Sequence, residues 1–211
     1  PIMTYGSEEQ KQLIPRTLQV DLIWCQLFSE PSAGVDLAAV RTRAVREGDS
    51  WKISGQKVWT SGAHVSDYGI LLARTDPELP KHKGLTFFVV DMRQPGVEVK
   101  PIKQISGQSE FNEVFLDGVV LPDSCRLGEV NQGWKVAMHA LSAERFKRLN
   151  TRMPSMLSVL DLAQHCDIEG KSAIERDDVR QYLAGALANQ CALENFMSRI
   201  LTVLSEGGEL G

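Results

Sequence analysis

The sequence predicts an α+β protein, with an antiparallel β-barrel or sandwich in the middle of the chain followed by long helices. Between about residues 20 and 128, short segments rich in β-branched and aromatic residues are separated by Gly, Pro, Asp and Ser. From Gly133 onward, apolar residues recur with helical spacing. The 211 residues suffice for one large domain or two modest ones, and they contain no internal repeat.

Residues 7–18, SEEQKQLIPRTL, form the first predicted helix. Ser7 and Gln10 have the spacing of a capping box, in which the two side chains satisfy backbone N–H groups at the start of a helix. Pro15 has no backbone N–H, so we expect it to disturb or end this helix.

Seven short segments then have the composition of strands. They are LIWCQLFS, RTRAVREG, WKISGQKVW, YGILLART, LTFFVV, VEVKPI and NEVFLDGVVL. Short strands separated by regular turns are typical of barrels and sandwiches, which is the basis of the predicted β domain.

Two long helices are predicted after the strands. The first begins at Gly133, in GWKVAMHALSAERFKRLN, and its small residues fall on one surface. The second opens at Asp177 and ends at Gly207 and Gly208, a common way to stop a helix. Its apolar stripe consists of Leu183, Leu187, Met197, Ile200, Leu201 and Leu204.

Composition excludes some classes of protein. The net charge is −4 and there is no basic stripe, so we expect no nucleic-acid partner. No window has the roughly 18 apolar residues of a membrane span, and the first residues do not resemble a signal peptide. The four cysteines, at positions 25, 125, 166 and 191, have no CxxC spacing. We expect them to be buried, reduced thiols in a reducing compartment, with no metal site.

A loop of small and polar residues follows the first predicted strand. The apolar segment stops at Ser29, and Glu30, Pro31 and the small residues 32–34 come next. Such a loop can bring backbone amides close to a flat or anionic ligand. The same composition also suits a plain surface turn, and the loop alone does not separate the two interpretations.

Five stretches, in this order along the chain, resemble landmarks of the FAD-dependent acyl-CoA dehydrogenases. They are YGSEEQKQLIPRTL, SEPSAGVDLAAVRTRA, ISGQKVWTSGAH, FNEVFLDGVVLP and LSAERF. The first three are similar to the family's GTEEQK, TEPGAGSD and NGxKxWITNG segments. The resemblance implies the end of an N-terminal helical domain at residues 1–18, a β-barrel middle domain at 19–128, and the first helices of a C-terminal helical domain at 129–211. The chain would then be a fragment of the usual subunit.

The resemblance also implies a reaction: FAD-dependent α,β-dehydrogenation of an acyl-CoA thioester to the 2-enoyl-CoA. A base takes the α-proton while a hydride passes to the flavin, and an electron-transfer flavoprotein then accepts the electrons. The flavin supplies the redox chemistry, and the protein supplies orientation and electrostatics.

Six residues match positions that contact the flavin in this family: Phe28, Ser29, Gly34, Val35, Trp59 and Ser61. Ser29 stands at the Thr of TEP, where a hydroxyl and neighbouring amides would bond the pyrimidine end of the ring and favour its reduced form. Val35 replaces a Ser whose hydroxyl helps to hold the FAD pyrophosphate, so the resemblance implies weaker anion binding here.

Trp59 and Ser61 match the other half of the family's flavin site. There the Trp packs against the ring, and the hydroxyl two residues later points at the N5 region. A Trp in a strand is also commonly a core residue, and a half-buried Trp can be both.

Glu144 is the candidate catalytic base, with Arg145 as its supporting neighbour. A branch of the family carries the base in a helix with the sequence ERL, which SAERF matches, whereas most members carry it in the later helices, which would lie beyond residue 211. Helical spacing groups Glu144 with Ala137, Ala140 and Leu141, a small apolar face that would strengthen a carboxylate as a base. The alternative is a surface ion pair with Arg148.

Two other functions stay open. A flavin monooxygenase or oxidase of the same superfamily uses the same loops, and a non-catalytic partner subunit of a hetero-oligomeric dehydrogenase would suit the change at Val35. The resemblance implies an acyl-CoA substrate, a homo- or hetero-oligomer (dimer or tetramer), and a cytoplasmic location, or the mitochondrial matrix in a eukaryote.

Overall fold

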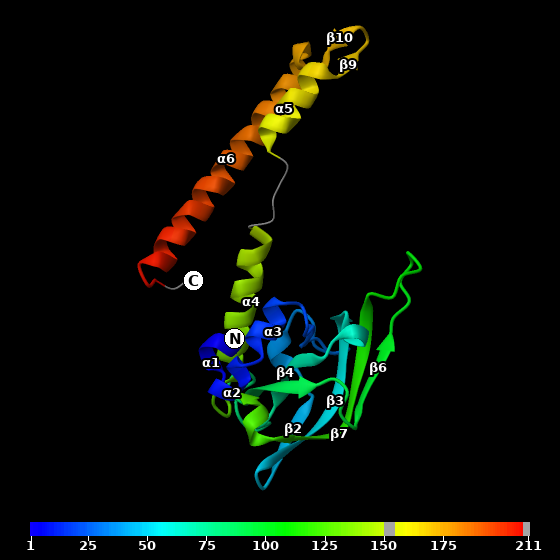
Figure 1. The fold of residues 1–211 in the computed structure, drawn as a ribbon, viewed down its shortest axis with the longest axis vertical. Coiled ribbons are helices and arrows are strands. Elements are labelled where there is room, and N and C mark those ends of the chain that lie inside the picture. Colours follow the sequence, from blue (N-terminus) through cyan, green and yellow to red (C-terminus); the bar gives the residue numbers. More distant parts are fainter. Residues whose placement is uncertain (150–154, 209–211) are drawn as a thin grey trace. The chain divides into compact units, whose positions relative to one another are not determined.

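The computed structural model describes residues 1–149 and 155–208, with the side chains of residues 145–149 outside that description. The chain forms two compact units, Pro1–Leu141 and Ser142–Gly211. Figure 1 shows both in the colours of the sequence.

The first unit is built on one eight-stranded sheet, and the seven predicted strands are all present. The strands are β1 Trp24–Leu27, β2 Arg43–Glu47, β3 Ser50–Ser61, β4 Tyr68–Arg74, β5 Leu85–Asp91, β6 Val97–Pro101, β7 Phe111–Pro122 and β8 Arg126–Leu127. Their order is β6-β7-β3-β2-β4-β5-β8, with β1 paired to β4. The predicted α+β class is confirmed, and within the described residues the pairing follows an open path from β6 to β8.

The sheet is mostly antiparallel, with two parallel contacts that the sequence pattern did not predict. β1 runs parallel to β4 over four residue pairs, and β2 meets β4 in parallel at Arg43 and Arg74. The residues that leave β1 can therefore cross directly to β2 along the same edge of β4. This crossing segment contains the loop that begins at Ser29.

Apolar side chains on both faces of the sheet explain the continuous apolar run of β5. Leu85 and Phe87 pack in one core cluster, whereas Phe88 and Val90 pack in the other. All four side chains are fully buried. Successive residues of a strand point to opposite faces, so a strand covered on both sides needs apolar residues throughout.

Helix α4, Gly133–Leu149, begins against one face of this sheet. Val136, Ala137 and Ala140 are buried in the same cluster as Phe87. A Cβ at Gly133 would lie 2.7 Å from the backbone of Thr86, so glycine is needed where the helix approaches β5. The predicted small-residue face is thus a packing face over its first turns.

Three short helices precede the sheet: α1 Ile2–Tyr5, α2 Glu8–Lys11 and α3 Ile14–Leu18. The predicted capping box is confirmed, because Gln10 N donates to Ser7 Oγ at 3.2 Å and Ser7 N donates to Gln10 Oε1 at 3.0 Å. Pro15 lies in the first turn of α3, where its missing N–H costs nothing, so residues 7–18 form two helices and not one.

The second unit is a helical hairpin. Its elements are α5 Met156–His165, β9 Asp167–Ile168, β10 Lys171–Ser172 and α6 Asp177–Ser205. The predicted start of α6 at Asp177 is confirmed, and Gly207 follows its end with a φ of 77°. A short 3₁₀ turn, η4 Ala173–Glu175, precedes α6, and three others, η1 Leu37–Ala39, η2 Ala63–Val65 and η3 Asp123–Cys125, lie in the first unit.

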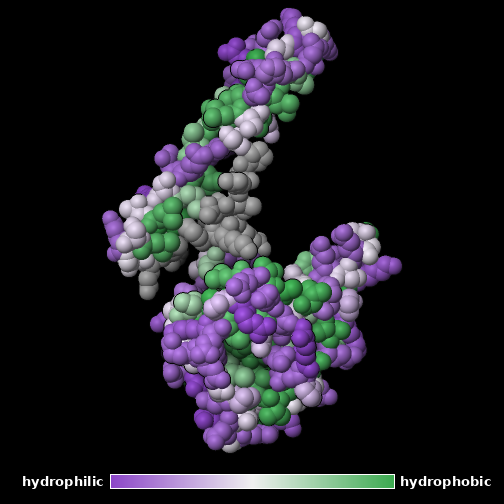
Figure 2. Space-filling model, viewed as in Figure 1, coloured by the Kyte–Doolittle hydropathy of each residue, from purple (hydrophilic) through white to green (hydrophobic). Residues whose placement is uncertain are grey.

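The apolar stripe of α6 is largely exposed in this unit. Leu183 is buried, whereas Leu187, Leu201 and Leu204 are each at least 40% exposed. Figure 2 shows hydrophobic side chains gathered along the hairpin.

The prediction of buried thiols was correct only in part. Cys25 is buried in the sheet and Cys125 is half-buried, but Cys166 and Cys191 are exposed. Cys166 ends α5 at the turn into β9, and Cys191 lies on an uncovered side of α6, so an apolar sequence context did not mean burial. Among the described helices, none is long and apolar enough to cross a membrane.

Candidate functional site

The loop after β1 is closed by a short turn. Glu30 N donates to Ala33 O at 2.9 Å, and Ala33 N donates to Glu30 O at 3.0 Å. Pro31 occupies the second position of this four-residue turn, where its fixed φ is favourable. Beyond the turn, Gly34 and Val35 are exposed.

A buried ion pair holds the loop from behind. The ammonium of Lys57 is fully buried and donates to Glu30 Oε1 at 2.9 Å, to Phe28 O at 3.0 Å and to Leu72 O at 2.8 Å. All three ammonium protons therefore have acceptors, as a buried charge requires. Lys57 in this way ties the loop to β3, which carries the lysine, and to β4, which carries Leu72.

The Glu30 carboxylate has further donors. Its Oε2 accepts from Arg41 N at 2.6 Å, and its Oε1 also accepts from Thr42 N at 2.9 Å. Burial alone would raise the pKa of Glu30, but the charge and hydrogen bonds of Lys57, with the two backbone donors, outweigh it and lower the pKa. Burial lowers the pKa of Lys57 to about 8, and Glu30 opposes that shift only in part.

A β-bulge lies immediately after Lys57. Lys57 pairs with Val114 and Thr60 pairs with Asn112, so two residues of β3 face a single residue of β7. Val58 N donates to Ser29 O at 2.9 Å, and Asn112 Nδ2 donates to Thr60 O at 2.9 Å. At the bulge, the Ser29 carbonyl and the Asn112 side chain therefore bond backbone groups of β3 that would pair with β7 in a regular antiparallel ladder.

Trp59, at the bulge, combines strain with exposure. Its φ is 59°, in the left-handed region that side chains other than glycine rarely adopt. Its side chain is 60% exposed, and the indole touches Phe111 edge-on at 6.0 Å between ring centroids. Core packing therefore does not explain this tryptophan, and a strained, exposed aromatic residue indicates a binding surface.

Two residues with hydroxyl groups lie near Trp59: Ser61 in the same strand and Ser29 in the neighbouring loop. Ser29 is half-buried, and its carbonyl is bonded to the residue before Trp59; Ser61, two residues after Trp59, is exposed. Neither hydroxyl makes a hydrogen bond with any residue that the structure describes. The structure thus brings Ser29 and the Trp59 strand together, and within the described residues both hydroxyls are available to a ligand.

The remaining predicted flavin contacts differ in character. Phe28 is a core residue whose ring meets Phe87 edge-on at 5.6 Å, so only its backbone borders the loop. A Cβ at Gly34 would meet no atom within 4 Å in the described chain, so packing within this chain does not require a glycine at that position. Val35 is fully exposed, and a single exposed apolar residue is common on protein surfaces, so its exposure alone does not indicate a site.

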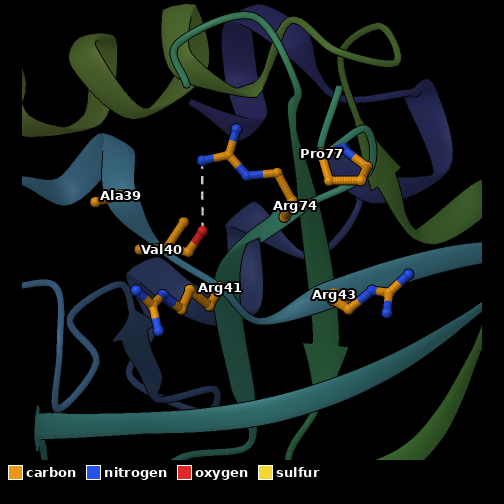
Figure 3. A pocket seen from close by; sticks show the side chains of 6 residues that line it. All are labelled: Ala39, Val40, Arg41, Arg43, Arg74 and Pro77. Carbon is orange, nitrogen blue, oxygen red and sulfur yellow. Dashed lines mark hydrogen bonds between the residues drawn. The ribbon is translucent and has the colours of Figure 1, made fainter. Parts of the chain in front are cut away.

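A shallow pocket of about 360 Å³ lies on the segment that follows the loop, lined by Ala39, Val40, Arg41, Arg43, Arg74 and Pro77. Figure 3 shows that the side chains of Arg41 and Arg43 extend away from each other. Arg74 instead donates to Ala38 O at 2.5 Å and to Lys81 O at 2.8 Å. This pocket therefore has no converging anion site, and Arg74 serves to hold the loop segment onto β4.

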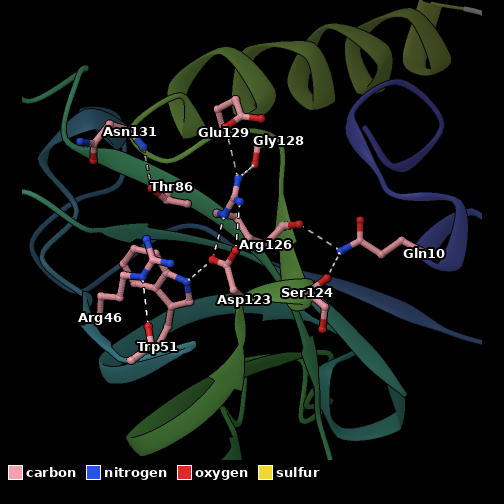
Figure 4. Close-up of polar contacts among 11 residues, drawn as sticks. Gln10, Arg46, Trp51, Thr86, Asp123, Ser124, Arg126, Gly128, Glu129 and Asn131 are labelled. Carbon is pink, nitrogen blue, oxygen red and sulfur yellow. Dashed lines mark hydrogen bonds and ion pairs between the residues drawn. The ribbon is translucent and has the colours of Figure 1, made fainter.

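The other end of β3 is held by a separate polar network. Trp51 Nε1 donates to Asp123 Oδ1 at 2.7 Å, and Asp123 is bonded twice by Arg126 (Figure 4). The hydrogen bonds from Arg126, followed by the one from Trp51, lower the pKa of Asp123 to about 2. Gln10 Nε2 donates to Ser124 O and Arg126 O, which fastens α2 to the sheet. We interpret this network as structural.

The candidate base lies in the other compact unit. Glu144 belongs to α4, four residues after the buried Ala140, and it is half-buried. The side chains of Arg145 and Arg148 lie outside the described residues, so the predicted support by Arg145 and the alternative ion pair with Arg148 are not part of this geometry. The role of Glu144 remains a prediction.

Sequence reasoning missed the most buried charged pair of the site, Lys57 and Glu30. The available signal was the position of Lys57 in WKISGQKVW, where a lysine stands among residues that the pattern assigns to a strand core. A lysine there must pair inside the protein, because an unpaired buried ammonium is too costly.

The comparison with known proteins matches this geometry. Residues 25–119 match the family described as acyl-CoA dehydrogenase, middle domain. The chain is 42% identical over 214 positions to "Acyl-CoA dehydrogenase FadE34" of Mycobacterium tuberculosis, an alignment that covers 99% of this chain and 29% of that protein.

Two solved structures share the fold over 99% of this chain. The "Tcur3481-Tcur3483 steroid ACAD" is 33% identical with a TM-score of 0.80, and the "ChsE4-ChsE5 complex from Mycobacterium tuberculosis" is 31% identical with a TM-score of 0.80. This chain spans 54% and 55% of those two chains.

The matched residues 25–119 carry most of the sheet of the first compact unit. The chain belongs to the acyl-CoA dehydrogenase family.

Proposed function

We propose that the protein containing this chain is an FAD-dependent acyl-CoA dehydrogenase that forms 2-enoyl-CoA, and that the loop at Ser29 and the bulge at Trp59 hold its flavin. The observation that carries the proposal is Trp59, with a φ of 59° and 60% of its side chain exposed. Strained backbone persists where function needs it, and here the exposed indole offers a flat apolar surface near two hydroxyls that make no hydrogen bond with the described residues.

The described residues fit a flavin ring in three respects. Trp59 offers an aromatic face, the Ser29 and Ser61 hydroxyls offer free hydrogen-bond donors, and Gly34 leaves open space for a ligand beside the loop. When bound, the flavin would supply hydride acceptance. Ser29 would donate to the ring and stabilise negative charge there, and Trp59 would cover the ring from water.

Glu144 would act as the base that removes the α-proton of the acyl-CoA. Its support is the match of SAERF to the ERL branch and its place in α4, one turn after the buried Ala140. A base in the later helices of the protein is the alternative. An electron-transfer flavoprotein would accept the electrons, by analogy with the family.

One experiment tests this function. The purified protein is loaded with FAD, freed of unbound FAD, and mixed with acyl-CoA thioesters of several chain types without oxygen. We expect about one FAD per site, bleaching of the flavin on mixing, and an enoyl-CoA product. Retained colour with every thioester would contradict the proposal, and oxygen consumption with product formation would instead favour the oxidase or monooxygenase alternative.

A second candidate function is a partner subunit that completes the site of another chain. The specific observation is Val35, which is fully exposed where the family has a serine that helps to hold the pyrophosphate. The names of two similar solved structures, Tcur3481-Tcur3483 and ChsE4-ChsE5, each describe two proteins. A protein that binds no FAD alone but binds it after mixing with a second dehydrogenase subunit would favour this function.

Val35→Ser separates the two candidates further. If Val35 only weakens an otherwise intact pyrophosphate site, this exposed substitution should tighten FAD binding severalfold and leave the fold unchanged. If the chain is a degenerate partner, the substitution should not restore FAD binding to the isolated protein.

A further inference from the structure

We propose that Lys57 is a positioning residue: its buried ammonium fixes the Ser29 loop against the Trp59 strand, so that the two halves of the flavin site keep one geometry. The inference rests on the proposed function of this site. No substrate or cofactor contact is assigned to Lys57 itself, because its ammonium is fully buried.

Hydrogen bonds from β3 fix the peptide groups on both sides of Ser29. Phe28 O is bonded by Lys57 Nζ, and the next carbonyl, Ser29 O, is bonded by Val58 N. Two successive carbonyls of the loop are thus fixed by two successive residues of β3. With both neighbouring peptide groups oriented, the direction in which the Ser29 side chain leaves the backbone is determined.

Lys57 also lies at the start of the bulge that contains Trp59. Trp59 lies two residues after Lys57, inside the bulge that begins at Lys57. A bulge with a left-handed tryptophan is strained, and it persists only when its surroundings hold it. Lys57 supplies such a hold on one side of the bulge, and Asn112, bonded to Thr60 O, supplies it on the other.

Hydrogen bonds to Glu30 and from Arg74 fix the loop at both of its ends. Glu30 binds the Lys57 ammonium and the backbone N–H groups of Arg41 and Thr42. Arg74 holds the carbonyls of Ala38 and Val40. The two ends of the segment from Glu30 to Thr42 are therefore joined by hydrogen bonds. Among the described residues, Lys57 is the only charged side chain of β3 that forms an ion pair with this segment.

A purely structural ion pair would affect stability and flavin binding together, so the test needs a matched control. Lys57→Met removes the ammonium and keeps the length of the side chain. Trp51→Ala, on the same strand, removes another buried group at the end of β3 where Asp123 binds. Both variants should lose stability, but only the first should release the loop.

The measurement is FAD affinity at a temperature where each variant is folded, together with amide hydrogen exchange of Val58, Arg41 and Thr42. We expect Lys57→Met to weaken FAD binding at least about tenfold and to speed exchange of these three amides at least about tenfold more than Trp51→Ala does. Trp51→Ala should bind FAD within about twofold of the wild type. If Lys57→Met does not fold, Lys57→Met with Glu30→Gln replaces it, since it leaves no unpaired charge.

The outcomes separate the two claims. Wild-type FAD affinity in a folded Lys57 variant overturns the positioning role and leaves the flavin site standing. An equal loss of affinity in Trp51→Ala also overturns it, because stability alone would then explain the loss. If the wild-type protein binds no FAD, the proposed function fails, and the positioning role fails with it.

Discussion

Trp59→Gly should weaken flavin binding at a smaller cost to the fold than the loss of a buried tryptophan. Glycine adopts a φ of 59° freely, whereas an L side chain pays about 1–2 kcal/mol there. Against this gain stand the lost edge contact with Phe111, about 0.5–1.5 kcal/mol, the extra entropy of an unfolded glycine, about 0.5–1 kcal/mol, and the lost burial of the unexposed part of the indole, on the order of 2 kcal/mol. The free energy of unfolding should therefore fall by about 2 kcal/mol.

Trp51 is the matched control for this substitution. It lies in the same strand, is only 3% exposed and donates a hydrogen bond to Asp123. Trp51→Ala should therefore cost about 3–5 kcal/mol, as large-to-small changes in a core do. The contrast between the two tryptophans follows from burial alone and does not depend on the ligand.

Urea unfolding followed by far-ultraviolet circular dichroism measures both changes, because it does not use tryptophan as the probe. FAD affinity, measured by titration, should fall at least about tenfold in Trp59→Gly, because an aromatic contact with its buried area is worth more than 1.4 kcal/mol. A loss of stability in Trp59→Gly as large as that in Trp51→Ala, or wild-type FAD affinity, would refute this prediction.

Three further predictions concern the same site. Ser29→Ala and Ser61→Ala should each remove one hydrogen bond, about 1 kcal/mol, from the flavin; the flavin potential should shift with the melting temperature unchanged, and a large melting shift with an unaltered flavin spectrum would count against the assignment. Glu144→Gln should bind substrate but slow anaerobic flavin bleaching at least about 100-fold, and normal bleaching would place the base elsewhere. Burial lowers the pKa of Lys57 from 10.5 to about 8, so between these pH values the unfolded chain holds a proton that the folded chain has released. The stability of the wild type should therefore rise with pH, relative to Lys57→Met with Glu30→Gln, by on the order of 3 kcal/mol across that window; parallel unfolding curves for the two proteins would show that the lysine does not titrate there.

The strands were predictable because their signals are local. Each of the seven segments has strand-forming residues bounded by Gly, Pro, Asp or Ser, and each formed a strand. The capping box of Ser7 and Gln10 and the start of α6 at Asp177 were predictable for the same reason. The parallel contact of β1 with β4 depends on which strands meet in space, and no local pattern encodes it.

The candidate site was predictable only in its outward-facing part. Ser29, Trp59 and Ser61 could be named from motifs, and the structure gives all three exposed or half-exposed side chains. The pairing of Lys57 with Glu30 joins residues 27 positions apart, and only the folded sheet brings them to 2.9 Å. The left-handed backbone at Trp59 likewise arises from a bulge whose register is set by β7.

The most direct test of the flavin site uses the indole N–H signals of the four tryptophans in a proton–nitrogen NMR spectrum recorded during titration with FAD. Trp59 is exposed beside the Ser29 loop, whereas Trp51 is buried at the other end of the same strand. The account predicts that the Trp59 signal shifts or broadens as FAD is added, while the Trp51 signal stays in place. An unchanged Trp59 signal at an FAD concentration that occupies the protein would contradict it.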